Sequence, residues 1–196
     1  MSGAGAGGPT SEPSGTESEV FLAALLAGVP GGLDDYFYLW TLADKISHSY
    51  PLRGATALAD AAELAAAAQR DVYVGVAVSA NPVPPHQRVK ADEAKGIFGL
   101  WSDIDTLHPV HKKVNLPATD EEAMELLMAP GLEPTILVKS GHGLQVWWLF
   151  EHAWIFGDDS ARVAAGGLAK AWNDAGGIAS GSSANCSDWR RSGNDS

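Results

Sequence analysis

The sequence predicts an α+β protein in which helices pack against one side of a sheet, and three observations lead to this class. Short apolar and aromatic runs of strand length alternate irregularly with longer segments that favour helices. Two strand-like runs in the second half are separated only by a short glycine-containing turn, as in an antiparallel hairpin. A chain of 196 residues with 45% hydrophobic residues has room for one well-packed domain.

Two helices and two strands are expected in the first half of the chain, after a tail. Residues 1–17 are small or polar beyond the first methionine, so they cannot bury enough surface to order themselves and should form a disordered tail. Residues 18–27 predict a short amphipathic helix, and residues 54–69 predict an alanine-rich helix. The aromatic segment 36–42 and the valine-rich segment 71–79 each favour a strand.

The second half of the chain adds three expected strands and two expected helices. Residues 96–105 form an apolar run that ends in two aspartates. The spacing of Thr and Glu at the start of 119–128 is that of a capping box and predicts a helix there. Residues 135–139 and 144–150 predict the hairpin strands, and residues 158–174 predict a helix with an inner face of leucine and alanine.

Composition divides the chain into one domain with irregular ends. Residues 18–175 carry all the expected elements, whereas residues 176–196 are mostly glycine, serine, asparagine and aspartate and predict an irregular or truncated C-terminal segment. The single cysteine, Cys186, allows no intrachain disulfide and favours the reducing cytoplasm. We expect no signal peptide, because the N-terminus lacks a basic region and a long apolar stretch. We expect no membrane association, because no apolar run is long enough to cross a bilayer.

Asp103 and Asp105 close the apolar run at 96–105. Side chains alternate faces along a strand, so the two carboxylates are expected to point the same way. Mg²⁺ and Mn²⁺ accept oxygen ligands, and Mg²⁺ commonly uses one or two carboxylates together with substrate phosphates. The pair therefore indicates a divalent metal site, although acidic pairs also occur as solvated loop starters.

The turn from Ser140 to Gln145 is the second candidate feature. Gly141 and Gly143 suit either a tight hairpin or a close approach of backbone N–H groups to a phosphate, and the two readings are compatible. Ser140 can donate a hydrogen bond, and His142 can donate one or carry charge near neutral pH. Gln145 stands on an otherwise apolar strand and needs a polar partner, either in a site or within the core.

The net charge of −11 weighs against a surface that holds nucleic acid mainly by electrostatics. Basic residues nevertheless cluster before the aspartate strand at Arg88, Lys90 and Lys95. These residues are either ordinary solvated side chains or a local basic patch, and we expect Arg88 to contribute to nucleotide binding. The tryptophans could stack on bases, but most lie in apolar strands and are expected in the core.

At these motifs the chain resembles the archaeo-eukaryotic primase superfamily, specifically the primase–polymerase domains of phage, plasmid and mobile-element replication proteins. The resemblance rests on Leu-Trp-Ser-Asp-Ile-Asp at 100–105, on Val-Lys-Ser-Gly-His-Gly-Leu-Gln-Val-Trp-Trp at 138–148, and on Asp-Val-Tyr-Val-Gly-Val at 71–76. It covers roughly residues 18–175 and implies an RRM-like sheet with additional strands and helices.

The resemblance also implies roles for individual residues. Asp103 and Asp105 would hold the divalent metals, while Ser140 and the glycine turn would contact the phosphates of the incoming nucleotide. The family often has a histidine on the strand after the serine and glycines; here His142 lies in the turn and Gln145 occupies the later position, so either residue is a candidate for its role. A third acidic ligand is expected further on, where Asp188 is the only faint candidate.

The implied function is that of a DNA primase–polymerase, making or extending primers by two-metal nucleotidyl transfer with Mg²⁺ or Mn²⁺. Its partners would be a single-stranded DNA template and nucleoside triphosphates, and the downstream helicase region common in such proteins is absent from this sequence. Two alternatives remain open at this point. One is a non-catalytic, single-stranded DNA-binding remnant, and the other is a metal-dependent glycosyltransferase that uses an Asp-x-Asp motif.

Overall fold

The computed structural model describes residues 16–53, 55–67, 72–107, 116–128, 131–139 and 143–175, and all structural statements refer to these ranges. The expected tails, and Asp188 with them, therefore lie almost entirely outside the described residues. The exceptions are Thr16 and Glu17, which begin the first helix instead of belonging to the tail. Thr16 caps that helix, since its side-chain oxygen accepts a hydrogen bond from the backbone N–H of Glu19 at 3.2 Å.

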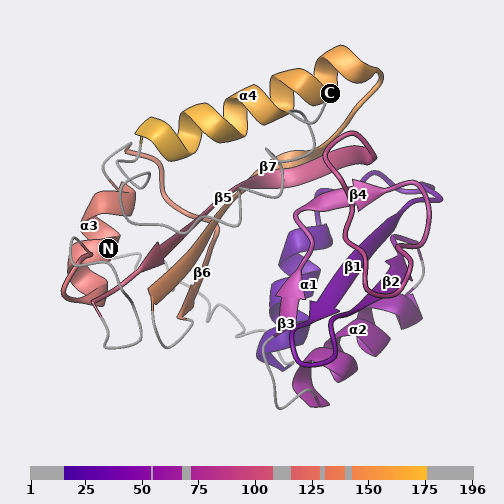
Figure 1. The fold of residues 1–196 in the computed structure, drawn as a ribbon, viewed down its shortest axis with the longest axis horizontal. Coiled ribbons are helices and arrows are strands. Elements are labelled where there is room, and N and C mark those ends of the chain that lie inside the picture. The colour runs from indigo at the N-terminus through magenta and orange to yellow at the C-terminus, as the bar shows by residue number, and fades with distance from the viewer. Residues whose placement is uncertain are drawn as a thin grey trace, which may run out of the picture.

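The fold is mixed α+β, as the sequence predicts, with an antiparallel sheet that curls into a half-barrel. The described helices are α1 (Glu17–Leu26), α2 (Ala55–Ala67), α3 (Asp120–Met128) and α4 (Asp159–Ala175). The described strands are β1 (Tyr36–Thr41), β2 (Ile46–Pro51), β3 (Val72–Val74), β4 (Ala77–Ser79), β5 (Ala94–Asp105), β6 (Ile136–Lys139) and β7 (Gly143–Ile155). Their order in the sheet is β2-β1-β4-β5-β7-β6, and β3 also pairs with β1 (Figure 1).

The prediction of a single strand over 71–79 is wrong, because the chain breaks at Gly75 into β3 and β4. β3 pairs with β1 along its whole length, whereas β4 pairs mainly with β5. Gly75 lies under the ring of Tyr38, where a Cβ atom would come within 2.2 Å of the ring carbon Cε1. The backbone N–H of Gly75 also donates to the carbonyl of Tyr38 at 2.9 Å. The break therefore comes from a tertiary contact with β1.

Two further differences concern strand content. β2 is not among the strands predicted from the sequence, because its polar sequence Ile-Ser-His-Ser-Tyr-Pro carries little apolar signal. Its buried Ser47 donates its hydroxyl hydrogen to the carbonyl of Gln87 instead of packing against apolar groups. β7 continues to Ile155 instead of ending at 150, because after a bulge Trp154 and Ile155 pair with the start of β5.

Helices cover both faces of the sheet, which corrects the expectation of a single covered face. Trp147 of β7 packs with α1, at 5.9 Å between its ring and that of Phe21. The neighbouring Trp148 points to the other face and meets Trp172 of α4 at 4.7 Å. Both faces of β7 are apolar, so each needs its own cover.

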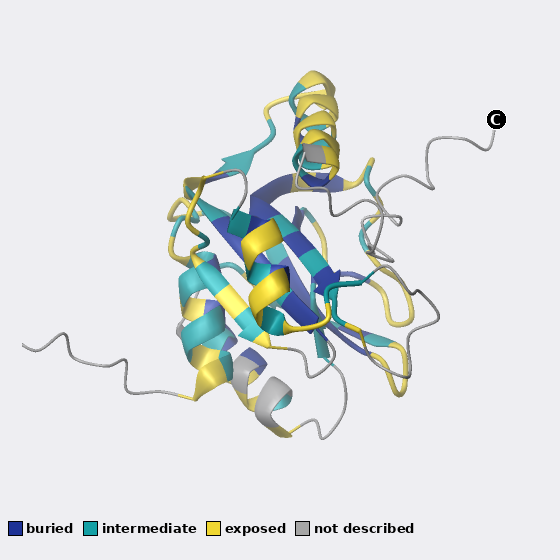
Figure 2. Cartoon of the chain, turned by 90° about the vertical axis from the view of Figure 1, so that its left-hand side faces the viewer, coloured by how far each residue is buried: buried dark blue, intermediate teal, exposed yellow. Residues whose placement is uncertain are grey.

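Two buried clusters result from this arrangement. The first joins α1 and α2 to the sheet through Leu22, Leu25, Phe37, Leu39, Ala61, Val78, Phe98, Trp147 and Ala153. The second joins α3 and α4 to the far ends of β5 and β7 through Leu100, Ile104, Ala123, Leu127, Leu144, Val146 and Trp148. Figure 2 shows buried residues concentrated in the strands, with exposed residues on the outer faces of the helices.

The remaining elements form as the sequence predicts, within a few residues at each end. α3 begins at the expected capping box, where the backbone N–H of Glu122 donates to the Thr119 hydroxyl at 3.3 Å. The expected loop at 108–117 lies mostly outside the described residues. None of the helices in the described ranges is both long enough and apolar enough to span a bilayer.

Candidate functional site

The candidate site lies on one face of the paired strands β5 and β7. In the antiparallel register, Asp103 is opposite Gln145 and Asp105 is opposite Gly143. Two positions earlier, Trp101 is opposite Trp147, and their rings lie 6.2 Å apart on the same face. The period of two therefore places both carboxylates and the Gln145 side chain on the Trp101 face of the sheet.

Gly143 brings β7 unusually close to β5 beside the aspartates. A Cβ atom on this residue would come within 2.1 Å of the carbonyl oxygen of Ile104 and 2.9 Å of the Cα atom of Asp105. Real Cβ atoms essentially never approach another heavy atom to less than 3.0 Å. The residue is therefore a glycine because the two backbones nearly touch, which holds the start of β7 against the end of the aspartate strand.

The opposite face of β5 is anchored in the core behind the aspartates. Ser102, fully buried and directly before Asp103 in the sequence, donates its hydroxyl hydrogen to Oδ1 of Asn173 on α4 at 3.1 Å. Asn173 is itself held by a hydrogen bond from its Nδ2 to the carbonyl of Ala169 at 2.9 Å. This polar contact and the buried Ile104 fix the strand from behind, while both aspartates remain half-buried on the front.

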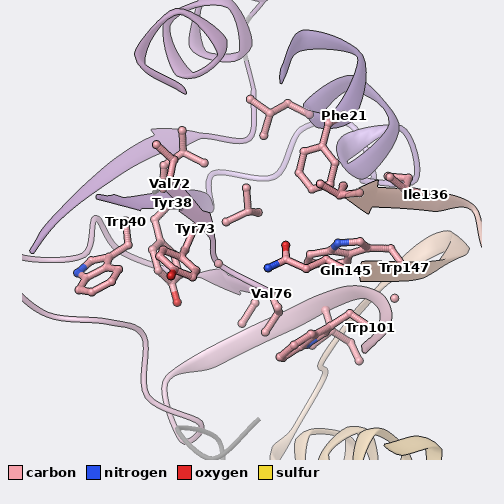
Figure 3. Close-up of a pocket in the computed structure, with 18 of the residues that line it drawn as sticks. Phe21, Tyr38, Trp40, Val72, Tyr73, Val76, Trp101, Ile136, Gln145 and Trp147 are labelled. Carbon is pink, nitrogen blue, oxygen red and sulfur yellow. The ribbon is translucent and has the colours of Figure 1, made fainter. Parts of the chain in front are cut away.

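A cavity of about 1560 Å³ adjoins this face, between β1 and β3 on one side and β5 to β7 on the other. Aromatic rings from four strands and one helix form much of its wall: Phe21, Tyr38, Trp40, Tyr73, Trp101 and Trp147 (Figure 3). Figure 3 shows the amide of Gln145 reaching from the Trp147 side towards the centre of this aromatic enclosure. The cavity therefore reaches Trp101 and Gln145 on the strand face that carries the aspartates, although neither aspartate lines it.

Arg88, expected at the site from the sequence, lies at the opposite wall of the same cavity. Its guanidinium carbon Cζ is 4.1 Å from the ring centroid of Trp40, which is a cation–π contact. The ring of Trp40 in turn packs against Tyr73 at 5.7 Å. The fold thus brings Arg88 and Gln145, 57 positions apart in the sequence, to one enclosure.

Ser140, Gly141 and His142 lie outside the described residues, so their contacts with phosphate stay a prediction. The two strands that the turn connects are described, and Lys139 pairs with Leu144 in the ladder between them. Lys139 lines the cavity and forms an ion pair with Asp120 at the start of α3, at 3.0 Å between Nζ and Oδ2.

The donor set at the aspartates suits a hard divalent cation. Asp103 and Asp105 supply carboxylate oxygens from one strand face, which Mg²⁺ and Mn²⁺ accept. The described ranges contain no group of three or more histidine, cysteine, aspartate or glutamate side chains that could hold a metal ion. A Mg²⁺ ion held by these two carboxylates would need water or substrate oxygens to complete its coordination.

Sequence reasoning missed the aromatic wall. It assigned most tryptophans to the core, and Trp40, Trp147 and Trp148 are indeed buried, but the first two also face the cavity. The alternation of Tyr36, Tyr38 and Trp40 in β1 was the available signal for a shared aromatic face. Nothing local in the sequence says that this face borders a cavity.

The fold and site define an α+β protein with a curled antiparallel sheet, a pair of aspartates on the cavity side of its long central strand, and an aromatic cavity beside them. No family model, curated protein or solved structure matches this chain in comparisons with known proteins.

Proposed function

We propose that this chain is a primase–polymerase-type nucleotidyltransferase domain that makes or extends DNA primers. The observation that carries the proposal is the placement of Asp103 and Asp105 on one face of β5, directly across from Gln145 and Gly143 of β7. The resemblance to the archaeo-eukaryotic primase superfamily relates the same two segments to metal binding and to nucleotide binding. An RRM-like core belongs to this proposal and is compatible with the antiparallel sheet.

In this proposal Asp103 and Asp105 hold Mg²⁺ or Mn²⁺, which in two-metal enzymes stabilises the attacking and leaving oxygens of phosphoryl transfer. The protein's own contribution is positioning. The close approach of Gly143 to Ile104 holds the start of β7 next to the carboxylates. Arg88 presents a guanidinium group that suits phosphate oxygens, and Gln145 presents an amide on the same side. The substrates are a nucleoside triphosphate and a primer on a single-stranded template.

A thermal-shift titration with dATP and Mn²⁺ is the first test. A ligand that binds only the folded state stabilises it, by about 2.7 kcal/mol at a hundredfold excess over Kd, and therefore raises the melting temperature. We expect such a shift in the wild type and its loss in Asp103→Asn/Asp105→Asn. Glu151→Gln, which removes an exposed carboxylate of β7 outside the cavity, is the matched control and should retain the shift.

Primer extension on a short template then tests the chemistry. Metal-dependent extension by the wild type and by Glu151→Gln, with none by the double aspartate variant, supports the proposal. A shift with dATP but no extension under any metal indicates the non-catalytic remnant. A shift with a sugar nucleotide and Mn²⁺, but not with dATP, indicates the glycosyltransferase.

A further inference from the structure

The aromatic cavity beside the aspartates is larger than a nucleotide requires. Pockets for small ligands usually have volumes of about 300–1000 Å³, whereas this cavity has about 1560 Å³. Its aromatic rings are also spread over β1, β3, β5 and β7 instead of forming one cage. Two groups of rings on opposite walls suit several stacked bases better than a single one.

We propose that this cavity binds a single-stranded nucleic acid segment, with bases stacked on its aromatic walls and one base edge meeting the amide of Gln145. The inference rests on the proposed function, since the bound segment would be the template or primer strand. It adds which residues hold that strand and which part of the strand each residue meets.

Gln145 provides the first argument for a polar ligand in this apolar enclosure. Its amide points into the cavity in Figure 3, and none of the described residues forms a hydrogen bond with it. A half-buried amide among aromatic rings needs partners, because its donors and acceptor have lost part of their water. Base edges offer both donors and acceptors, and glutamine pairs with adenine through two hydrogen bonds.

Charge provides the second argument, because the cavity differs in sign from the chain. The chain carries 13 basic and 24 acidic residues. Among the described residues that line the cavity, the charged ones are four basic and one acidic: Arg88, Lys90, Lys139, Lys170 and Glu17. Lys139 and Lys170 belong to the sheet face that α3 and α4 cover, so Arg88 and Lys90 are the cations on the aromatic side. A basic lining attracts the anionic backbone of a strand locally, although the chain as a whole is acidic.

The ion pair of Lys90 does not prevent this role. Its acidic partner, Glu93, does not line the cavity. The Lys90 side chain is 63% exposed, and exposed ion pairs of this kind contribute little. A phosphate in the cavity can therefore recruit this ammonium group at small cost.

Arg88 and Trp40 provide the third argument, because together they form a prepared surface. The guanidinium already lies close enough to the indole to bring Cζ within 4.1 Å of the ring centroid. An arginine held on an aromatic ring offers a planar face for a base and N–H groups for a phosphate. Trp101 and Trp147 offer a second surface across the cavity, tilted by 34° to each other.

The test is fluorescence anisotropy with a labelled mixed-sequence DNA strand of about twelve nucleotides, within the range of sites known for single-strand binders. The full chain is titrated in EDTA without nucleotide, so binding does not depend on the metal site. We expect binding that weakens by about sevenfold from 50 to 200 mM salt if Arg88 and Lys90 each meet a phosphate.

Three variants test the residue assignments. Trp101→Leu should weaken binding by at least about fivefold, since stacking of one base on an aromatic ring accounts for that much. Arg88→Gln and Gln145→Met should each weaken binding severalfold. The matched controls, Trp154→Leu and Arg53→Gln, alter a half-buried tryptophan and an exposed arginine outside the cavity and should bind as the wild type does.

Circular dichroism confirms that each variant is folded before it is compared. The inference is overturned if the folded wild type does not bind the strand at low salt, or if the three cavity variants bind like their controls. It is also overturned if dATP displaces the strand at equal nucleotide concentration, which would mark a mononucleotide pocket. Strand binding without primer extension refutes only the proposed function, and extension unaffected by the cavity variants refutes only the inference.

Discussion

Replacing Gly143 by alanine should change both the stability of the sheet and the geometry of the candidate site. The added Cβ would lie 2.1 Å from the carbonyl oxygen of Ile104, where at least 3.0 Å is needed. β7 must therefore move away from β5 by about 0.9 Å at the pair formed by Asp105 and Gly143. The atoms in the way belong to the backbone, so no side chain can turn aside to make room.

We expect Gly143→Ala to lower the free energy of unfolding by about 1–3 kcal/mol, the usual cost of overpacking a well-packed interior. For a domain of this size, that corresponds to a fall in melting temperature of roughly 2–12 °C. The same displacement beside Asp105 should lower nucleotidyl transfer by about 100-fold, because a misplacement of 1 Å can have that effect.

Gly167→Ala is the matched control for this prediction. Gly167 lies within α4, and a Cβ there would meet nothing within 4 Å. Since alanine favours helix over glycine, this variant should be more stable than the wild type by about 0.5–1 kcal/mol. Urea and thermal unfolding followed by circular dichroism measure both variants. The reasoning is refuted if Gly143→Ala is as stable as the wild type, or if both substitutions change stability in the same direction.

Two further predictions concern α4. Ser102→Ala removes the buried hydrogen bond to Asn173 and should cost about 1 kcal/mol in urea unfolding. Ser102→Ala/Asn173→Leu, which makes both sides apolar, should regain part of that loss, and a double variant less stable than the single one would contradict this account. Asp158 caps α4, and hydrogen bonds from the Ser160 hydroxyl and the Ala161 backbone N–H lower the pKa of its carboxyl group. Because the folded-state pKa is depressed, the resulting stability is complete above the unfolded-state pKa and is lost as pH falls through the folded-state pKa. Asp158→Asn keeps a capping oxygen but cannot titrate, so its deficit in melting temperature at neutral pH should vanish in acid, and a deficit that does not change with pH would exclude this effect.

Local patterns predicted most helices and strands to within a few residues. The capping box at Thr119, the apolar run of β5 and the alanine-rich α2 each report their structure through neighbours in the sequence. β2 was not predicted because it has no apolar pattern of its own. Its strand is held by pairing with β1 and by the hydrogen bond from Ser47 to Gln87, which are not local in the sequence.

The candidate site was predictable only along each strand. The period of two put Asp103 and Asp105 on one side, and it put Gln145 and Trp147 on one side of the following strand. Whether these two sides coincide depends on the register between β5 and β7, which places Asp103 opposite Gln145. No local rule contains that register, since it is set by the packing of two strands whose closest approach requires Gly143.

The sequence by itself determined the class of fold, the shared face of the aspartate pair and the strands β6 and β7, because each follows from spacing over a few residues. Only the tertiary structure decided that the 71–79 segment breaks at Gly75, that helices cover both sheet faces, and that Arg88 meets the aromatic wall. Trp147 and Trp148 are adjacent and chemically identical, yet one borders the cavity and the other meets α4. Their difference arises from where distant helices pack, and that is a property of the whole chain.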